Sequence, residues 1–212
     1  TGPCGPCSEI FYDHGEAFSG ESPAEGVDTG DRFVEIYNLV VMQFNRSPDG
    51  ELSPLPKPSV DTGMGLERIT AVLQGINDNY ETDLFKDLIK KIASNLGAQN
   101  LENPSLRVIA DHLRSSSYLI ADGLSVSNEG RGYVLRRIIR RAVRAIYRLT
   151  DELMSLEFLI NIVIRDYQDS YPELLENKDK ILNLYKNEEE IFQNTLVKGN
   201  QEIQSILKKK SN

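Results

Sequence analysis

The pattern of apolar and polar positions changes once along the chain, near residue 80. Before that point, short runs rich in Val, Ile, Phe and Tyr alternate with polar residues, and seven of the nine prolines and ten of the fifteen glycines lie before residue 76. Such composition is typical of strands separated by turns. Strands of one antiparallel sheet are expected over residues 8–14, 32–46 and 58–63. The polar segment 15–31 is expected to be a solvated connection, and the Pro-rich segment 45–59 a hairpin or loop.

After residue 80 the apolar residues recur with a period near 3.6, which predicts helices. Including one helix that follows the last strand and stops at Gly75, helices are expected over residues 65–74, 80–97, 104–122, 132–149, 151–169 and from 172 to the lysines at 208–210. The fold class is therefore α+β. A sheet-containing domain is expected over residues 1–80, followed by a helical bundle over residues 81–212.

Charge is divided unequally between these two parts. The net charge of the chain is −8, but residues 1–80 hold 13 acidic and 4 basic residues, whereas residues 81–212 hold 19 acidic and 20 basic ones. Clustered arginines in the second part can therefore bind a polyanion despite the acidic total. No run of about 18 apolar residues and no signal-peptide pattern occurs, so neither membrane insertion nor secretion is indicated. Because the chain begins with Thr in a turn-rich stretch, we expect it to be a piece of a longer polypeptide.

The two cysteines lie together in the sequence CGPC, at Cys4 and Cys7. A C-x-x-C pair can be a redox motif or half of a zinc site, or the Pro-Gly context can make it a rigid turn before a strand. With no second pair to complete a tetrahedral shell, zinc is not expected. His14 and His112 have no partner at metal or catalytic-triad spacing and are expected to be structural.

The segment VDTGMGLERI, residues 60–69, places chemical groups of three kinds at a strand-to-helix junction. The glycines Gly63 and Gly65 let a ligand approach the main chain closely. Arg68 carries a permanently charged fork that suits phosphate oxygens, and Asp61 supplies the opposite charge for an ammonium group or a metal. The alternative is an ordinary packed turn in which Asp61 caps the helix.

Arginines are concentrated in the expected helix over 132–149. Arg136, Arg140, Arg144 and Arg148 recur at every fourth position, with Arg137 and Arg141 beside them. Leu135, Ile138, Ile139, Ala142 and Ile146 form the opposing apolar stripe. Since no acid lies between Arg131 and Arg148 to pair along the helix, the backbone of RNA is one natural counter-ion. Carboxylates from other helices are the alternative.

The segment GMGLERI resembles the third signature motif of class II aminoacyl-tRNA synthetases. The longer strings VDTGMGLERITAVLQG, TGPCGPCSEIFYDHG, VEIYNLVVMQFNR, RVIADHLRSSSYLIADG and SNEGRGYVLRRIIRRAVR together resemble the alanyl-tRNA synthetases within that class. The resemblance spans residues 1–149, with the motifs in the family's order. It implies that residues 1–80 are the C-terminal part of the antiparallel catalytic domain, and that residues 81–212 are a helical tRNA-recognition domain.

The resemblance also implies roles for residues of the first domain. Arg68 matches the arginine that holds the γ-phosphate of ATP; Gly65 lies beside it, and Glu9 is a candidate ligand of Mg²⁺ or a surface residue. Four residues are implied to bind alanine: Asp61 through its ammonium group, Asn38 on the other side of the pocket, and Gly63 and Val40 by limiting its size. Asn38 can instead face solvent, and Val40 can be a core residue.

In the second domain, Asn128 matches an asparagine that helps to recognise a G·U pair in the acceptor stem of tRNA(Ala). Its alternative role is that of a turn former or helix cap. A second acceptor-stem residue, an aspartate, has no match before residue 212. The residues expected to bind tRNA are Asn128, Arg131, Arg136, Arg137, Arg140, Arg141 and Arg144.

The chain departs from the family pattern in what it lacks. The family's first two motifs and its editing domain have no match, and Tyr37 stands where a pocket tryptophan is often found. We therefore expect the full-length protein to be a cytoplasmic ligase that activates alanine with Mg²⁺ and ATP and transfers it to tRNA(Ala), and this piece alone to be inactive. The alternatives are a non-catalytic RNA-binding module and a helical scaffold for acidic proteins. The oligomeric state is left open.

Overall fold

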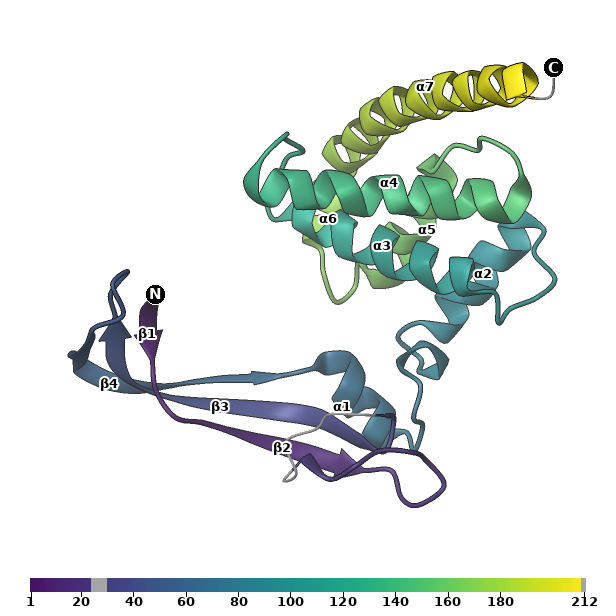
Figure 1. Ribbon diagram of the computed structural model, residues 1–212. Coiled ribbons are helices and arrows are strands. Elements are labelled where there is room, and N and C mark those ends of the chain that lie inside the picture. The colour runs from purple at the N-terminus through teal and green to yellow at the C-terminus, as the bar shows by residue number, and fades with distance from the viewer. Residues whose placement is uncertain (24–29, 211–212) are drawn as a thin grey trace. The chain divides into compact units, whose positions relative to one another are not determined.

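The computed structural model describes residues 1–23 and 30–210, so that residues 24–29 of the connection expected over 15–31 lie outside the described residues. The chain divides into two compact units, Thr1–Leu84 (unit 1) and Phe85–Asn212 (unit 2), each drawn in Figure 1. Unit 1 contains a sheet and unit 2 consists of helices, which confirms the α+β class.

Unit 1 is built on an antiparallel sheet with β3 at its centre. Its elements are β1 (Gly2–Cys4), β2 (Cys7–Asp13), β3 (Phe33–Arg46), β4 (Leu52–Met64), α1 (Leu66–Leu73) and the short 3-10 helix η2 (Asn79–Glu81). Along one edge of β3 lie β1 and β2, and along the other lies β4. Both β1 and β4 pair with residues 44–46, so they must occupy opposite edges.

The Pro-rich segment forms a hairpin, which was one of its two expected forms. Strand β4, however, starts at Leu52 rather than at residue 58. Proline removes a ladder donor, and β4 tolerates this because β3 is its only partner among the described strands. The register between Met42↔Ser59 and Phe44↔Pro54 leaves residues 55–58 opposite one residue of β3. The sequence pattern obscured the strand because its prolines lie along an edge and in this bulge.

The CGPC segment is a bend that joins β1 to β2 along β3. The N–H of Val41 donates to the Pro6 carbonyl at 2.8 Å, and a Cβ on Gly5 would lie 1.7 Å from the Val41 carbonyl oxygen. Only glycine lets the bend approach the strand this closely. Cys4 and Cys7 form no disulfide. The structural interpretation thus has a physical basis, whereas redox or metal use stays an untested alternative.

At the C-terminal end of β2, an ion pair between Asp13 and Arg32 holds the strand in place. Arg32 donates to the two carboxylate oxygens of Asp13 at 2.7 and 2.9 Å. These hydrogen bonds and the one from the Gly15 N–H lower the pKa of Asp13 to about 2. The pair therefore stays charged through the neutral range.

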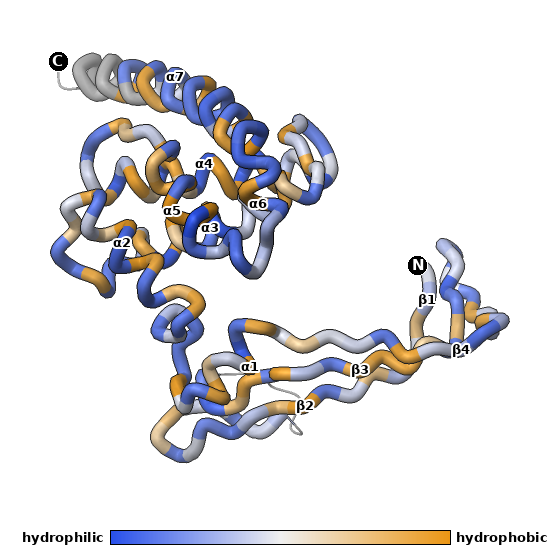
Figure 2. Tube along the Cα trace, turned by 180° about the vertical axis from the view of Figure 1, so that it is seen from behind, coloured by the Kyte–Doolittle hydropathy of each residue, from blue (hydrophilic) through white to orange (hydrophobic). Residues whose placement is uncertain are grey.

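Unit 2 is a helical bundle arranged around α3. Its helices are α2 (Lys86–Leu96), α3 (Pro104–Ala121), α4 (Gly130–Thr150), α5 (Glu157–Tyr167), α6 (Glu173–Glu176) and α7 (Lys178–Lys210). Contacts join α3 to each of the other five. Fully buried side chains from these helices include Ile92, Ile109, Leu113, Ile139, Leu159 and Ile181. In Figure 2 the apolar stretch of α5 stands out within this unit.

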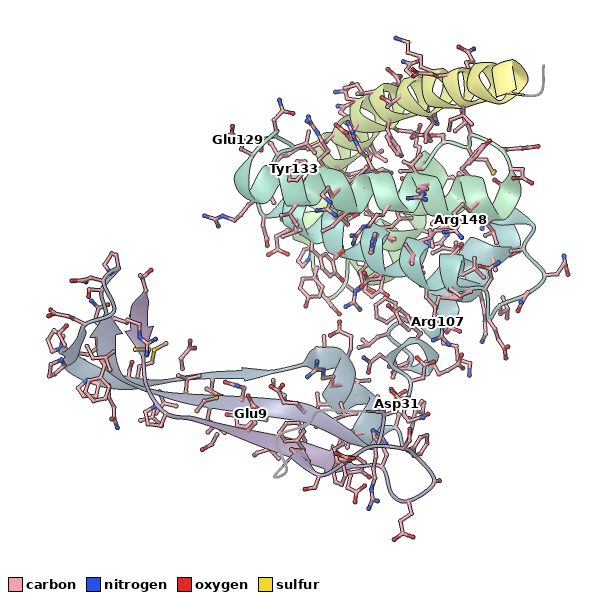
Figure 3. All side chains as sticks on the ribbon, viewed as in Figure 1. Glu9, Asp31, Arg107, Glu129, Tyr133 and Arg148 are labelled. Carbon is pink, nitrogen blue, oxygen red and sulfur yellow. The ribbon has the colours of Figure 1, made fainter. Side chains whose placement is uncertain are left out.

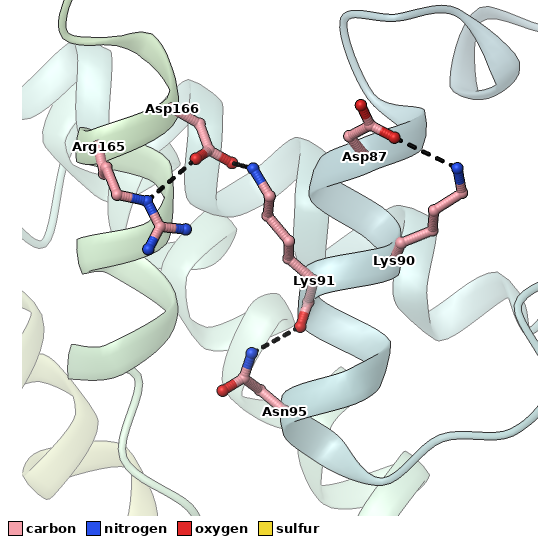
Figure 4. Close-up of polar contacts among 6 residues, drawn as sticks. All are labelled: Asp87, Lys90, Lys91, Asn95, Arg165 and Asp166. Carbon is pink, nitrogen blue, oxygen red and sulfur yellow. Dashed lines mark hydrogen bonds and ion pairs between the residues drawn. The ribbon is translucent and has the colours of Figure 1, made fainter.

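Polar contacts supplement this core. Lys91 of α2 reaches Asp166 of α5 at 2.7 Å, and Arg165 contacts the same carboxylate at 3.3 Å (Figure 4). The hydroxyl of Tyr185 contacts Ser116 and donates to the Leu113 carbonyl at 3.3 Å, and burial raises its pKa to about 12.

Among the described residues, no helix has both the length and the apolar character needed to cross a membrane.

We expect Gly5→Ala to destabilise the sheet, because its methyl group would overlap the Val41 carbonyl. Overpacking of this kind costs about 1–3 kcal/mol. Hydrogen exchange followed by mass spectrometry should show faster exchange in peptides from β1, β2 and the middle of β3. Gly199→Ala is the control, since a Cβ there meets no atom within 4 Å and alanine favours a helix. Unchanged exchange in the Gly5 variant would contradict the close approach.

Candidate functional site

The register of the sheet gathers the predicted alanine and ATP residues of the strands on one face. Glu9, Asn38 and Gly63 form one row across β2, β3 and β4. Two residues further along each strand, Cys7, Val40 and Asp61 form the next row. Because side chains alternate with a period of two, paired residues and their second neighbours share one face. Figure 3 labels Glu9 on this sheet.

Hydrogen bonds hold Asn38 in place on this face. Its Nδ2 donates to Glu9 Oε1 and to Cys7 Sγ, each at 3.2 Å. The amide oxygen of Asn38 and the second carboxylate oxygen of Glu9 therefore remain available, with no partner among the described residues. Asn38 does not simply face solvent, which had been its alternative.

Asp61 is exposed, and its side chain contacts no partner in the part of the chain that the structure describes. It does not cap α1, which begins after Gly65 without a side-chain capping bond. The alternative of a helix cap therefore has no support in the geometry. The carboxylate is left as an uncompensated negative charge on the face.

Gly63 is not required by packing. A Cβ there would meet no atom within 4 Å, and its backbone is not in the left-handed region. Gly5 relieves a clash within the chain, whereas the space over the exposed Gly63 is open. Packing within the described chain therefore does not account for the glycine at position 63.

Arg68 lies over Gly65 at the start of α1. A Cβ on Gly65 would lie 3.3 Å from Arg68 Cδ, so the Arg68 side chain passes over Gly65. Gly65 continues the series of every second residue that contains Asp61 and Gly63. The Nη1 of Arg68 donates to the Glu35 carbonyl at 2.8 Å and lies 3.6 Å from Glu35 Oε2. The side chain remains 48% exposed, so part of the guanidinium can receive a further acceptor.

The opposite face of the same sheet is mainly apolar. It carries Ile10, Tyr37, Leu39, Val41, Val60 and Met64, together with Ser8 and Thr62 beside Leu39. The predicted alanine-binding residues of the strands lie together on the other face. Two members of the polar group, Cys7 and Glu35, escaped sequence reasoning, because only the strand register reveals their contacts.

In unit 2 the four arginines that recur at every fourth position of α4 do not share one side of the helix. An α-helix turns about 100° per residue, so every fourth position advances about 40° beyond a full turn, and Arg148 lies about 120° around the helix from Arg136. Arg136 and Arg140 contact Glu188 of α7, whereas Arg144 and Arg148 are exposed.

Arg136 and Arg140 face α7, where they meet a buried carboxylate. Glu188 is 1% exposed and lies 2.6 Å from Arg140 Nε and 3.3 Å from Arg136 Nε. Arg140 also lies over the Phe192 ring, 5.1 Å from its centroid. For these two arginines the counter-charge comes from another helix, as the alternative had it. Their contact with RNA stays a prediction.

Glu188 was missed although the sequence carries a signal for it. Ile181, Tyr185, Glu188 and Phe192 fall on one helical face, so an acid occupies a position in the apolar stripe of α7. Next to it, burial raises the pKa of Glu189, whose carboxylate accepts the Leu156 N–H at 3.2 Å.

The loop before α4 is tied to the same charge group. Arg136 Nη1 donates to the side-chain oxygen of Asn128. The loop also packs closely on the helix, because a Cβ on Gly132 would lie 2.4 Å from the Ser125 carbonyl oxygen and 2.5 Å from Ser127 Oγ. Asn128 is thus fixed through its oxygen, while its amide nitrogen and the side chain as a whole remain exposed.

The other arginines of α4 lie on its exposed side. Arg137, Arg141, Arg144 and Arg148 form an exposed stripe with Val134, which is 55% exposed (Figure 3 labels Arg148). Arg137 lies over the Tyr133 ring at 5.9 Å. Arg141, Arg144 and Arg148 have no ion pair or hydrogen bond with the side chains that the structure describes. Arg131 is exposed in the first turn, apart from the stripe.

Three features are consistent with a class II tRNA synthetase: an open polar sheet face, a following helix with an arginine in its first turn, and a bundle that contains an arginine-rich helix. The chain matches the family model described as tRNA synthetases class II (A) over residues 1–212, and it belongs to this family.

Its curated relatives include alanine–tRNA ligases of several bacteria. The enzyme of Neisseria meningitidis serogroup C / serotype 2a is 55% identical over 212 residues, which are 100% of this chain and 24% of the relative. That of Idiomarina loihiensis is 55% identical over 199 residues, 94% of this chain and 23% of the relative. That of Methylobacillus flagellatus is 53% identical with the same coverage. The chain therefore spans about a quarter of the length of these relatives.

We expect Glu188→Ala to lower the free energy of unfolding by about 3–5 kcal/mol, because Arg136 and Arg140 would lose their buried counter-charge. Chemical denaturation followed by circular dichroism measures this loss. Glu190→Ala on the same helix is the matched control, since Glu190 is exposed and its removal should change stability by about 0.5 kcal/mol or less. Equal effects of the two substitutions would remove Glu188 from this role.

Proposed function

We propose that this chain is part of an alanine–tRNA ligase, with the catalytic face in unit 1 and acceptor-stem recognition in unit 2. The observation that carries the proposal is the open face on which Asp61, Gly63 and Asn38 lie together, with Arg68 over Gly65, two residues after Gly63. The names of the relatives support it. In this proposal unit 1 is the C-terminal part of the catalytic domain, and the full-length protein works in the cytoplasm.

Alanine fits the two rows of paired residues on this face of the sheet. Asp61 would accept hydrogen bonds from the α-ammonium group. The amide oxygen of Asn38 would be a further acceptor, because only the Nδ2 of this residue is used in the hydrogen bonds to Glu9 and Cys7. The empty space at Gly63 suits a substrate whose side chain is one methyl group. Val40, paired with Asp61, would limit the pocket along β3.

ATP and Mg²⁺ fit the remaining groups. Arg68 would hold the γ-phosphate with N–H groups that its contact with Glu35 does not use. Gly65 allows the arginine to lie close to the main chain. The second oxygen of Glu9 is suited to Mg²⁺, which proteins commonly bind through one or two carboxylates together with substrate phosphates. When bound, ATP supplies the pyrophosphate leaving group; the residues of the chain position the alanine carboxylate and stabilise the departing charge.

The acceptor stem of tRNA(Ala) would meet unit 2 at Asn128. Because Arg136 occupies the amide oxygen, the nitrogen is left to donate to acceptors in the shallow minor groove of A-form RNA. Glu188 and Arg136 would act as positioning residues. Arg137, Arg141 and Arg144 of the exposed stripe, with Arg131, would contact backbone phosphates.

A non-catalytic RNA-binding module is not favoured. Such a module would have no use for an unpaired Asp61 or for a glycine at position 63 that packing does not demand. A helical scaffold for acidic proteins would leave the whole polar sheet face without a role.

Asp61→Asn in the full-length protein should raise the KM for alanine in ATP–pyrophosphate exchange by about 10- to 100-fold, because a charge-assisted hydrogen bond is worth about 1.5–3 kcal/mol. The KM for ATP should change little. Glu51→Gln, which removes an exposed carboxylate at the start of the same hairpin arm, is the control. An unchanged alanine KM would refute the substrate role of the carboxylate.

Asn128→Ala should reduce the preference for an acceptor stem with a G·U pair over one with a G·C pair by about 1–2 kcal/mol, the scale of one hydrogen bond. Aminoacylation of the two stems by the full-length enzyme, compared as kcat/KM, measures this preference. Asn194→Ala on α7 is the control. If both stems lose activity equally, Asn128 does not recognise the base pair.

A further inference from the structure

A cavity of about 470 Å³ lies between the start of α3 and the C-terminal half of α4. Arg141, Arg144 and Arg148 line it from α4, and Ser105 and His112 line it from α3. This cavity is separated from the Asn128 loop along α4, because its lining residues from Arg141 to Arg148 lie about 17 to 27 Å from residue 130 at 1.5 Å per residue.

The charge of the cavity is strongly positive. None of its three arginines has an ion pair or hydrogen bond with the described part of the chain, and no carboxylate belongs to its lining. Two acids are chain neighbours of lining residues: Glu102 precedes Asn103, and Asp111 precedes His112, whose Nδ1 lies 2.8 Å from Asp111 Oδ2. Neither acid pairs with one of the three arginines.

The N-terminal end of α3 adds positive charge to the cavity but supplies no free backbone N–H groups. Asn103 caps the helix by accepting the Ser105 N–H at 2.9 Å, and its carbonyl accepts the Leu106 N–H at 2.9 Å. The helix therefore contributes the positive end of its dipole, while donors must come from side chains. The Ser105 hydroxyl and the arginine forks are donors of this kind.

We propose that this cavity binds a phosphate group of the RNA backbone, and that Ser105, His112 and Arg148 belong to the RNA interface together with Arg141 and Arg144. The proposal rests on the proposed function for the identity of the RNA. It assigns α4 two different contacts: base recognition at its N-terminal loop, and a sequence-independent backbone contact at its other end.

Two substitutions in the full-length protein test the backbone contact. Arg148→Gln removes a donor, and Ser105→Asp adds a carboxylate to the cavity at a helix start, where acids favour folding. Each should weaken binding of acceptor-stem RNA roughly tenfold, equally for G·U and G·C stems, and should lower the slope of log Kd against log salt concentration by about 1. Arg165→Gln and Asn194→Asp are charge-matched controls outside the cavity.

A second measurement uses inorganic phosphate alone. An arginine-specific dicarbonyl reagent, with modification mapped by mass spectrometry, should modify Arg144 and Arg148 several-fold more slowly in the presence of phosphate. Arg137 and Arg165 serve as references in the same digest, because neither lines the cavity. Ser105→Asp should abolish the protection.

The two measurements separate the possible failures. Unchanged RNA affinity and salt slope in both variants would overturn the backbone contact, and so would a loss confined to one stem sequence. If the wild-type protein binds no stem RNA but phosphate still protects Arg144 and Arg148, the proposed RNA function fails and the cavity is a site for a free phosphate. Absence of protection together with unchanged RNA binding would overturn the cavity itself.

Discussion

The pairing of β3 with neighbours on both of its edges is the constraint on which the candidate catalytic face depends. Its register brings Glu9, Asn38 and Gly63 into one row although 29 and 25 positions separate neighbouring members along the chain. A shift by one residue would turn every one of these side chains to the apolar face. The close approach of Gly5 to the Val41 carbonyl lies next to the pair Cys7↔Val40, so the bend and the row that carries Asp61 meet in the same part of β3.

A buried carboxylate plays the corresponding part in the helical unit. Glu188 takes two arginines out of the exposed surface and holds one of them against Asn128. Buried charge is costly unless it is well paired, so such a group is weak evidence for stability but good evidence for a fixed geometry. Here the residue held in place is Asn128, whose side-chain amide is exposed. The same residue type therefore serves two purposes on one helix: arginines facing α7 orient a loop, and those on the exposed stripe carry free charge.

The sequence predicted more of the elements than of their contacts. Periodicity identified α3, α4 and the apolar side of α4, since burial of one face leaves a regular signal. Residues 52–57 of β4 were not predicted as strand, because its prolines resemble loop composition when the edge position of the strand is unknown. The resemblance to synthetases supplied Asp61, Asn38 and Arg68 as site residues. It did not supply Glu188, Glu35 or Cys7. Their contacts with Arg140, Arg68 and Asn38 join residues that are 31 or more positions apart in sequence, so they become visible only through packing.

Two glycines illustrate how a ligand can be inferred from a chain that contains none. At Gly5 the folded chain itself forbids a side chain, so nothing beyond the chain is needed to explain the residue. At Gly63 the chain would accept a side chain without a clash or a strained backbone, yet position 63 keeps the residue that costs most conformational entropy on folding. Asp61, two residues earlier on the same face, is exposed and has no partner among the described residues, so its carboxylate is free to pair with a cation. The proposed alanine site uses both features, because the missing side chain at position 63 leaves room for a substrate and the carboxylate at position 61 meets its ammonium group.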